Sequence, residues 1–286
     1  MKTAVITGAT SGIGFETASL LARKGFRVLG IGHSEENCLK AQERILSENP
    51  DAKIAYFWGD LMQQREVLCL SRDVAAYLSE NCDGELHVLI NNAGCVRSWY
   101  ATTDEGYEQQ FALNHLAGFY LTHGLLPFLK KTKGRVIMTG SKSHKGIKVR
   151  WGDVMLSRGY NPLIAYKQSK LCNVLFAKGI NDRYAAEGVR AYVVDPGLVN
   201  TDIGNKKTGT LVKLIWALRK LQGVPPTVPA KTYAFLCEQE KAPEGLCYYL
   251  CRETTYSKQV TSENASRLFA LSERLCGICY GREAAV

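Results

Sequence analysis

The sequence predicts a doubly wound α/β fold, in which helices cover both faces of a mainly parallel sheet. Short apolar runs, of a length suited to buried strands, alternate with amphipathic stretches along the chain. A glycine-rich turn at residues 7–14 joins the first apolar run to the first amphipathic stretch. The chain has 286 residues, of which 46% are hydrophobic, and this is enough to build a sizeable core.

Six apolar runs predict strands, and three intervening stretches have clear helical spacing. The absence of internal repeats, low-complexity tracts and linkers predicts one domain over residues 1–286. The expected strands are Lys2–Thr7, Arg27–Ile31, Lys53–Trp58, His87–Ile90, Arg135–Thr139 and Arg190–Val194. The expected helices include Phe15–Arg23, Glu36–Leu46 and Gln168–Tyr184.

The charge pattern argues against a nucleic-acid partner. The formal net charge is +9, but lysines and arginines are scattered, without a long basic run or an aromatic-interleaved stripe. No apolar stretch reaches the ~18 residues of a membrane span, and the chain opens directly on a strand-like run. These features lead us to expect a protein of the cytoplasm.

Ten cysteines raise the questions of disulfides and of a metal. For a chain of this length in a reducing compartment, we expect free thiols. The pairs Cys247/Cys251 and Cys276/Cys279 resemble the spacing of a zinc site. However, Gly245–Cys251 reads as a strand, which would hold the first two sulfurs about 13 Å apart. We therefore predict no metal site.

The glycine-rich turn predicts a site for a nucleotide. Thr7-Gly8-Ala9-Thr10-Ser11-Gly12-Ile13-Gly14 follows the first strand and opens the first helix. Glycines let the backbone approach a pyrophosphate closely, and the helix N-terminus supplies free N–H groups and partial positive charge. A plain strand-to-helix turn is the alternative, but the position at the first strand–helix junction favours the nucleotide.

The end of the second strand distinguishes NADP(H) from NAD(H). An NAD site places Asp or Glu there, to bond the ribose hydroxyls. This chain has Gly32-His33-Ser34 instead, with no carboxylate and without the usual arginine of an NADP site. His33 can carry positive charge beside a 2′-phosphate, and Ser34 can donate a hydrogen bond to it. We therefore expect NADP(H) to be preferred over NAD(H).

Four motifs in this order resemble those of the short-chain dehydrogenase/reductase family, which has a Rossmann-type fold. They are Thr7–Gly14, Asn91–Gly94, Tyr166–Lys170 and Asp195–Gly197, and they span most of the chain. A narrower resemblance, to the retinol dehydrogenase-like branch, rests on Ser141–His144, Trp151–Phe176 and Ala265–Leu275. That branch implies a lipophilic alcohol or carbonyl substrate.

The resemblance implies a role for each matching residue. Residues 1–140 would bind most of the cofactor, and residues 141–286 would supply most of the catalytic and substrate-binding part. The helix that carries Tyr166 pairs subunits in many members, which makes a homodimer an expectation by analogy. Asp195 replaces the His or Asn common before the Pro-Gly turn. The implied catalytic tetrad is Asn114, Ser141, Tyr166 and Lys170, and the implied cofactor contacts are Gly8, Ser11, Gly12, Ile13, Gly14, Asp60, Leu61, Asn92, Ala93, Gly94, Pro196, Gly197, Val199 and Thr201.

The residue types of the tetrad suit proton transfer beside a hydride transfer. Free tyrosine has a pKa of about 10, too high for an efficient base at neutral pH. Lys170 lies one helical turn after Tyr166, so its ammonium should favour the tyrosinate form. Ser141 would hold the substrate oxygen, and Asn114 would position a water that relays protons to Lys170. His115 and His144 are expected to be structural.

The substrate end leaves alternatives open. Leu211–Leu221 reads as a basic amphipathic helix: a surface helix, a lid over an apolar substrate, or an interfacial helix on an acidic bilayer with Lys206 and Lys207. Trp99, Tyr100, Trp151 and Tyr160 would either line the pocket or pack. Two other functions stay open, a non-catalytic NADP(H) sensor and a reductase of conjugated or ring double bonds.

Overall fold

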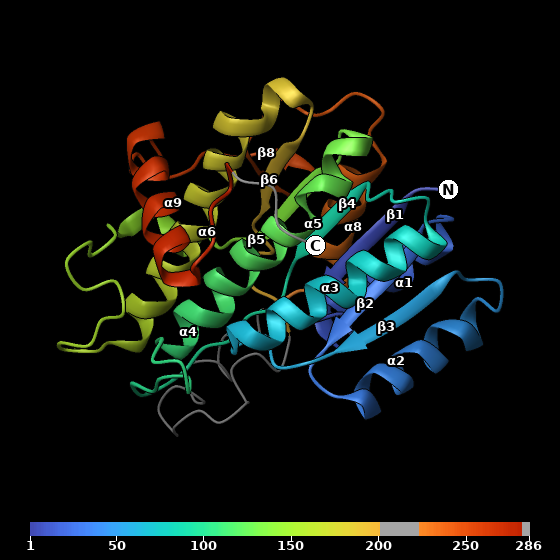
Figure 1. Cartoon of the computed structure of the whole chain (residues 1–286), viewed down its shortest axis with the longest axis horizontal. Helices are drawn as coiled ribbons and strands as arrows, with labels where there is room; N and C mark the ends of the chain where they lie inside the picture. Colours follow the sequence, from blue (N-terminus) through green and yellow to red (C-terminus); the bar gives the residue numbers. More distant parts are fainter. Residues whose placement is uncertain (201–222, 282–286) are drawn as a thin grey trace.

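A computed structural model describes residues 1–200 and 223–281. An eight-stranded sheet lies between two layers of helices (Figure 1). Its strand order is β3-β2-β1-β4-β5-β6-β7-β8, parallel except for the last pair. The order reverses between β1 and β4, where such sheets open a ligand crevice at the carboxyl ends of their strands. The strands are β1 (Thr3–Thr7), β2 (Arg27–Gly32), β3 (Ile54–Trp58), β4 (Val88–Asn91), β5 (Arg135–Thr139), β6 (Arg190–Val194), β7 (Cys247–Tyr249) and β8 (Arg252–Glu253).

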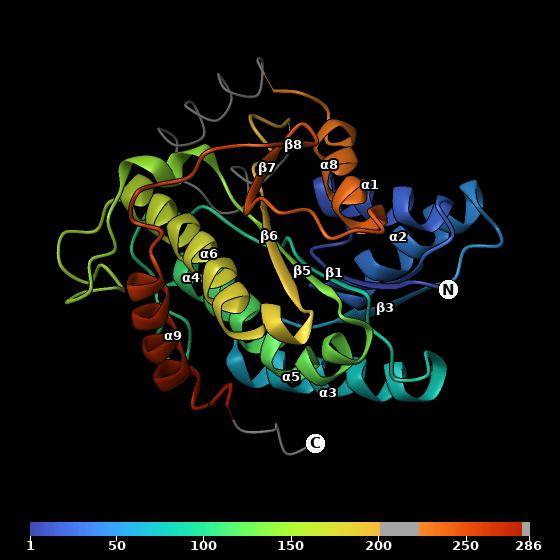
Figure 2. The ribbon, with the colours of Figure 1, turned by 90° about the horizontal axis from the view of Figure 1, so that it is seen from above.

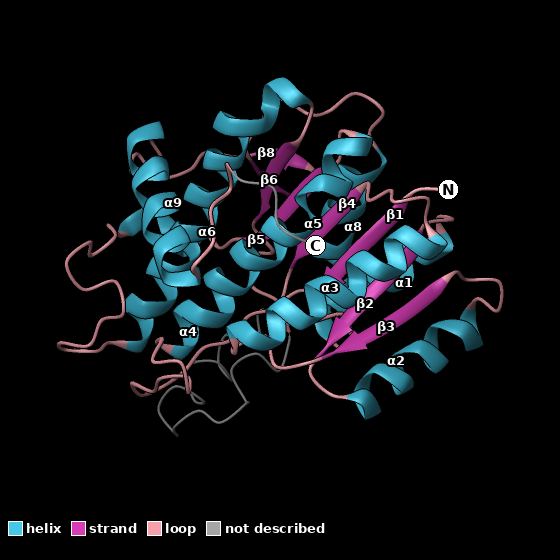
Figure 3. Cartoon of the chain, in the orientation of Figure 1, coloured by secondary structure: helices cyan, strands magenta, loops and turns pink. Residues whose placement is uncertain are grey.

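The helices separate into the two faces that Figures 2 and 3 show. On one face lie α3 (Gln64–Asn81), α5 (Ala117–Thr132) and α6 (Pro162–Tyr184), with α9 (Ser262–Cys276) packed outside α6. On the other lie α1 (Gly12–Arg23), α2 (Glu35–Glu48) and α8 (Thr227–Glu238). The remaining short segments are α4 (Gln109–Phe111), the π-helix η1 (Ala112–Leu116), and the 3-10 helices η2 (Lys142–Gly146) and η3 (Ala185–Glu187).

Each central strand is buried on both faces, which explains its unbroken apolar run. Val5 of β1 joins the core on the α3–α5–α6 face, and its neighbours Ala4 and Ile6 join the core on the α1–α8 face. The predicted doubly wound single-domain α/β fold is therefore confirmed. All six predicted strands are present: β5 and β6 have the predicted bounds, and no end of the other four differs by more than one residue.

The helix expected at Gln168–Tyr184 begins six residues earlier, at Pro162. Asn161 caps it, because its side-chain oxygen accepts hydrogen bonds from the N–H groups of Leu163 and Ile164. Proline at the first helical position fits this start, since its missing N–H is not needed there. Tyr166 therefore lies in the second turn of a capped helix.

The strand expected over Gly245–Cys251 is wrong at its end. It stops at Tyr249, and the chain turns through Leu250 and Cys251, whose φ angles are 48° and 61°. The chain then returns as β8, so strand spacing does not separate Cys247 from Cys251.

Within residues 1–200 and 223–281, no three His, Cys, Asp or Glu side chains gather closely enough to hold a metal ion. The described helices include none with the length and apolar character to cross a membrane.

Candidate active site

The glycine-rich turn brings the end of β1 against the start of α1. Gly8 has a φ of +66°, and a Cβ on Gly14 would lie 2.1 Å from the Gly8 carbonyl oxygen. Neither position therefore accepts another residue without a backbone shift. Ser11 adopts the extended backbone that precedes α1, and Gly12 and Ile13 form its first positions. The Ser11 side chain makes no capping hydrogen bond, so the first N–H groups of α1 are left available for an anion such as a pyrophosphate.

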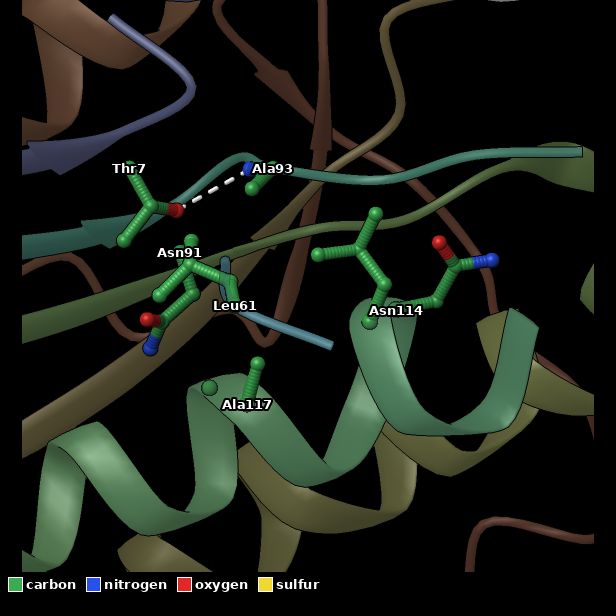
Figure 4. Close-up of a pocket in the computed structure, with 8 residues that line it drawn as sticks. Thr7, Leu61, Asn91, Ala93, Asn114 and Ala117 are labelled. Carbon is green, nitrogen blue, oxygen red and sulfur yellow. Dashed lines mark hydrogen bonds between the residues drawn. The ribbon is translucent and has the colours of Figure 1, made fainter. Parts of the chain in front are cut away.

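The loop after β4 is pinned to this turn by Thr7. The Thr7 hydroxyl accepts hydrogen bonds from the N–H groups of Asn92 and Ala93, at 2.9 and 3.0 Å. The Asn92 side-chain amide donates to the Thr7 carbonyl at 3.0 Å. Figure 4 shows this join above a small cavity, with Asn114 and Ala117 on the helix that faces it. The structure thus brings the expected pyrophosphate and ribose segments together.

The ends of β2 and β3 lie side by side, as expected for the adenosine end. His33 is 76% exposed at its side chain, and its Nδ1 lies 3.9 Å from a carboxylate oxygen of Asp60. Leu61 is buried and lines the same small cavity as Ala93. The Ser34 hydroxyl accepts a hydrogen bond from Asn37. No carboxylate follows β2 directly, but Asp60 approaches His33 from the neighbouring strand.

Lys170 is the most deeply placed of the tetrad residues. It is 2% exposed, and its Nζ donates a hydrogen bond to the Thr139 carbonyl at 3.0 Å. Nζ also lies 5.7 Å from the centre of the Tyr166 ring. Burial lowers the pKa of the Lys170 ammonium to about 8. The expected pairing of Tyr166 and Lys170 on one face of a helix is therefore found.

Asn114 braces the loop at Gly94 against the helix of Tyr166. Its side-chain oxygen accepts from Cys95 N–H at 2.7 Å, and its amide donates to the Cys95 carbonyl and to Ser169. A Cβ on Gly94 would lie 3.0 Å from Asn114 Oδ1 and 3.6 Å from Lys170 Nζ. Both amide hydrogens of Asn114 are engaged, so its side chain can only accept from a further group.

Ser141 follows β5 and begins η2. Its hydroxyl accepts a hydrogen bond from the hydroxyl of Ser143 at 3.0 Å. The imidazole of His144 lies beneath this turn, with Nδ1 at 2.6 Å from the Ser141 carbonyl oxygen. On its other side, Nε2 accepts from Ser257 N–H at 3.3 Å. These two contacts require a proton on Nδ1 and none on Nε2, which is the neutral form of the ring. Burial favours the same form, because it lowers the pKa of His144 below its usual value.

The Pro-Gly turn after β6 owes its shape to Asp195. The Asp195 carboxylate accepts a hydrogen bond from Gly197 N–H at 3.0 Å, which closes a tight turn around Pro196. A Cβ on Gly197 would lie 3.0 Å from the ring of Tyr249. Val199 pairs with Val224. Thr201, Lys206, Lys207 and the segment Leu211–Leu221 lie outside the described residues.

Three of the four candidate pocket aromatics have partners within the protein, since the rings of Tyr100 and Tyr160 also pack edge to face with their centres 5.6 Å apart. Trp151 lies under the guanidinium of Arg267, and the Tyr160 hydroxyl donates to buried Glu108. Trp99 and Tyr100 are 49% and 40% exposed. The sequence motifs assigned no role to three residues close to the tetrad: Thr139, Ser169 and Asn173. Each acts through a tertiary contact or a backbone carbonyl, which no local pattern displays.

A doubly wound sheet whose crevice joins a glycine-rich helix start to a Tyr–Lys pair, with the lysine buried, defines a class of nucleotide-dependent oxidoreductases. Residues 2–211 match the family described as short chain dehydrogenase. The chain belongs to this family of oxidoreductases, as the motifs predicted.

Its relatives include enzymes named for lipophilic alcohols. Bovine retinol dehydrogenase 12 is 33% identical, over 97% of this chain and 87% of the relative. Human retinol dehydrogenase 13 is also 33% identical, over 97% of this chain and 85% of the relative. Human polyprenol dehydrogenase is 36% identical, over 71% of this chain and 62% of the relative. The predicted likeness to the retinol dehydrogenase-like branch is confirmed.

Solved structures confirm the fold. A protein from Mycobacterium paratuberculosis has a TM-score of 0.74 at 26% identity, covering 98% of this chain and 95% of that one. An alcohol dehydrogenase from Thermococcus sibiricus, solved with 5-hydroxy-NADP, has a TM-score of 0.68 at 22% identity, covering 91% and 97%. A Sphingobium yanoikuyae dehydrogenase, solved with NADPH, has a TM-score of 0.68 at 18% identity, covering 100% and 98%.

Proposed function

We propose that this chain is an NADP(H)-dependent oxidoreductase that interconverts an alcohol and a carbonyl group on a lipophilic substrate. The observation that carries the proposal is the placement of Lys170, wholly buried beside the ring of Tyr166 and adjacent to the Gly94 loop. Burial of an ammonium costs free energy, so such groups are found preferentially at functional sites, and here Nζ lies 5.7 Å from the ring of the tyrosine that we propose exchanges a proton.

The crevice fits a dinucleotide. The contact of Gly14 with the Gly8 carbonyl leaves no side chain between the turn and a bound pyrophosphate. Asp60 and Leu61 would contact the adenine, the loop Asn92–Gly94 the adjoining ribose, and Lys170 the nicotinamide ribose. Pro196, Gly197 and Val199 would border the nicotinamide. His33 and Ser34 favour a 2′-phosphate, and the structural neighbours solved with NADP or NADPH support the same choice.

In the mechanism we propose, bound nicotinamide supplies or accepts the hydride, and the protein moves the matching proton. The Ser141 hydroxyl, held in place by the turn over His144, donates a hydrogen bond to the substrate oxygen and stabilises the charge that develops there. The Tyr166 hydroxyl gives its proton to that oxygen in reduction and takes it back in oxidation. The Lys170 ammonium stabilises tyrosinate, and Asn114 holds the Gly94 loop against Lys170.

The substrate class rests on the relatives and on the rim of the site. Retinol and polyprenol, named in the relatives, are long apolar alcohols. Trp99, Tyr100, Leu198 and Tyr249 are large side chains between 40% and 49% exposed, and Tyr249 contacts the Pro-Gly turn. Exposed apolar side chains of this kind suit a lipophilic substrate better than a small polar one.

Turnover with graded substrates tests this function. Loss of NADPH fluorescence would be followed with aldehydes and ketones of increasing chain length, and with enones. We expect kcat/KM to rise with apolar chain length, and carbonyl reduction to exceed double-bond reduction. Tight NADPH binding without turnover of any compound would favour a cofactor sensor, and preferential reduction of the enone double bond would favour the alternative reductase.

A further inference from the structure

A buried polar network surrounds the one carbonyl that holds Lys170. The Thr139 carbonyl oxygen accepts two hydrogen bonds, from Lys170 Nζ at 3.0 Å and from the Asn173 side-chain amide at 3.1 Å. Lys170 and Asn173 are 2% and 1% exposed. They lie three residues apart on α6, so they project from the same face of the helix. Lys170 and Asn173 therefore both bind this oxygen, and each restrains its orientation.

The Thr139 side chain is fixed as well. Its hydroxyl lies 2.6 Å from the hydroxyl of Tyr233, which is fully buried on α8. β5 thus carries a residue held from both layers of helices, by α6 at its carbonyl and by α8 at its hydroxyl. Such a residue offers Lys170 an acceptor whose position varies little.

His115 is the next side chain of this network, beside Asn173. His115 is fully buried, and its Nε2 lies 2.9 Å from the Ser272 hydroxyl on α9. Its Nδ1 and Asn173 Oδ1 have no hydrogen bond of normal geometry within the described residues, yet the two side chains interact. An Asn173 amide that donates to Thr139 directs its oxygen to His115, whose Nδ1–H is the matching donor. Burial lowers the pKa of His115 to about 3, so the imidazole stays neutral.

We propose that Asn173 is a positioning residue for Lys170, acting through the Thr139 carbonyl that the two side chains share. His115 and Ser272 hold the Asn173 amide in the orientation that donates to this carbonyl. The catalytic consequence rests on the proposed function, whereas the effect on Lys170 itself does not. Without Asn173, the Thr139 carbonyl turns more freely, and the ammonium no longer shares the oxygen with a second donor.

Asn173→Leu, which is nearly isosteric, tests the proposal against Asn181→Leu. Asn181 lies on the same helix and also makes two hydrogen bonds to a neighbouring strand, through the backbone of Ala191. We expect Asn173→Leu to lower kcat roughly tenfold or more and to raise the NADPH Kd several-fold. The KM of the substrate should stay within about twofold, because neither Asn173 nor Lys170 contacts the substrate. Asn181→Leu should change none of the three beyond about twofold.

A second readout needs no activity. The free energy of unfolding is measured against pH for each protein with and without Lys170→Met, and the difference isolates the titration of Lys170. We expect Asn173→Leu to move this titration to higher pH, because the ammonium has the oxygen to itself, while Asn181→Leu leaves it in place. This shift tests the inference even if the proposed enzymatic function is wrong.

The contrary results are equally definite. An unmoved Lys170 titration with an unchanged NADPH Kd would show that Asn173 only packs α6 on β5. If Asn173→Leu does not fold, Asn173→Ala removes the amide without overfilling the site, and the same shifts are expected. Loss of folding in both variants while Asn181→Leu folds would also overturn the proposal, because a positioning role leaves the packing of α6 intact.

Discussion

Nδ1 of His144 lies 2.6 Å from the backbone oxygen of Ser141, and this contact ties the turn of the proposed catalytic serine to a buried, neutral imidazole. The Ser257 N–H donates a hydrogen bond to the other ring nitrogen, Nε2. With both nitrogens engaged inside the protein, His144 has no free atom to offer a substrate. Its place in the site is to hold Ser141.

Replacing His144 tests this assignment. We expect His144→Phe to lower kcat about tenfold through a displaced Ser141, with NADPH affinity unchanged. Ser141→Ala should cost more, on the order of 10²–10³ in kcat, because it removes the donor to the developing charge. Steady-state kinetics with a shared substrate compares the two. A His144→Phe loss as large as that of Tyr166→Phe would instead make His144 the proton donor.

The buried charge of Lys170 should destabilise the protein at neutral pH. Below its folded-state pKa of about 8, Lys170 is charged in both states, and the full penalty of burial is present. Between that value and the unfolded value of 10.5, the unfolded state binds more protons, so the free energy of unfolding rises with pH. We expect Lys170→Met to add up to about 3 kcal/mol at pH 7, and this gain should shrink above about pH 8. Urea unfolding across this pH range measures both, and a variant no more stable than the wild type at pH 7 contradicts the account.

The proposed preference for NADPH over NADH should be reversible at His33 and not at Gly32. A Cβ at Gly32 would lie 2.4 Å from Cys38 Sγ and 2.6 Å from Thr10 Cγ2, so an acidic side chain does not fit there. His33 is exposed and accepts substitution. We expect His33→Asp to raise the ratio of NADPH Kd to NADH Kd about tenfold through repulsion of the 2′-phosphate.

Fluorescence titration of both cofactors measures this ratio. His33→Asn separates loss of the imidazole from gain of a carboxylate, and should move the ratio less. Equal affinity of the wild type for NADPH and NADH would contradict the predicted preference, whatever the variants do.

His115 should make the fold sensitive to acid. Its pKa is about 3 when folded, because burial disfavours the imidazolium, and 6.5 when unfolded. The unfolded state therefore binds more protons below pH 6.5, and stability from this residue falls as the pH drops toward 3, by about 1.4 kcal/mol per pH unit. In His115→Phe, which suits the surrounding rings of Phe111, Phe119 and Phe176, this part of the slope should vanish. An unchanged slope of unfolding free energy against pH would show that His115 is not buried as a neutral group.

Local patterns in the sequence predicted the elements that build the crevice. Buried strands, a glycine-rich turn and a Tyr–Lys pair four residues apart each have a spacing that the backbone imposes. The start of α6 at Pro162 could also have been predicted, since Asn161 and Pro162 form an ordinary cap and first position. The turn at Leu250 and Cys251 could not, because neither residue is typical of the left-handed backbone that it adopts.

The contacts around Lys170 could not be predicted from the sequence, for a different reason. The Thr139 carbonyl, Asn173 and His115 meet only after β5, α6 and η1 pack, and a backbone oxygen carries no signal in its residue type. The role of Asp195 was equally hidden, since its carboxylate serves the backbone of its own turn.

The most direct test of the account is the rate of Tyr166→Phe. The phenyl ring keeps the packing but removes the group that exchanges a proton with the substrate oxygen. General acid–base catalysis contributes roughly 10²–10⁴ in rate, and Tyr166 should also orient that oxygen. We therefore expect kcat to fall at or beyond the upper end of this range, with NADPH affinity within a few-fold of wild type. Retention of more than about a tenth of the wild-type rate would contradict the assignment of Tyr166 as the main acid and base.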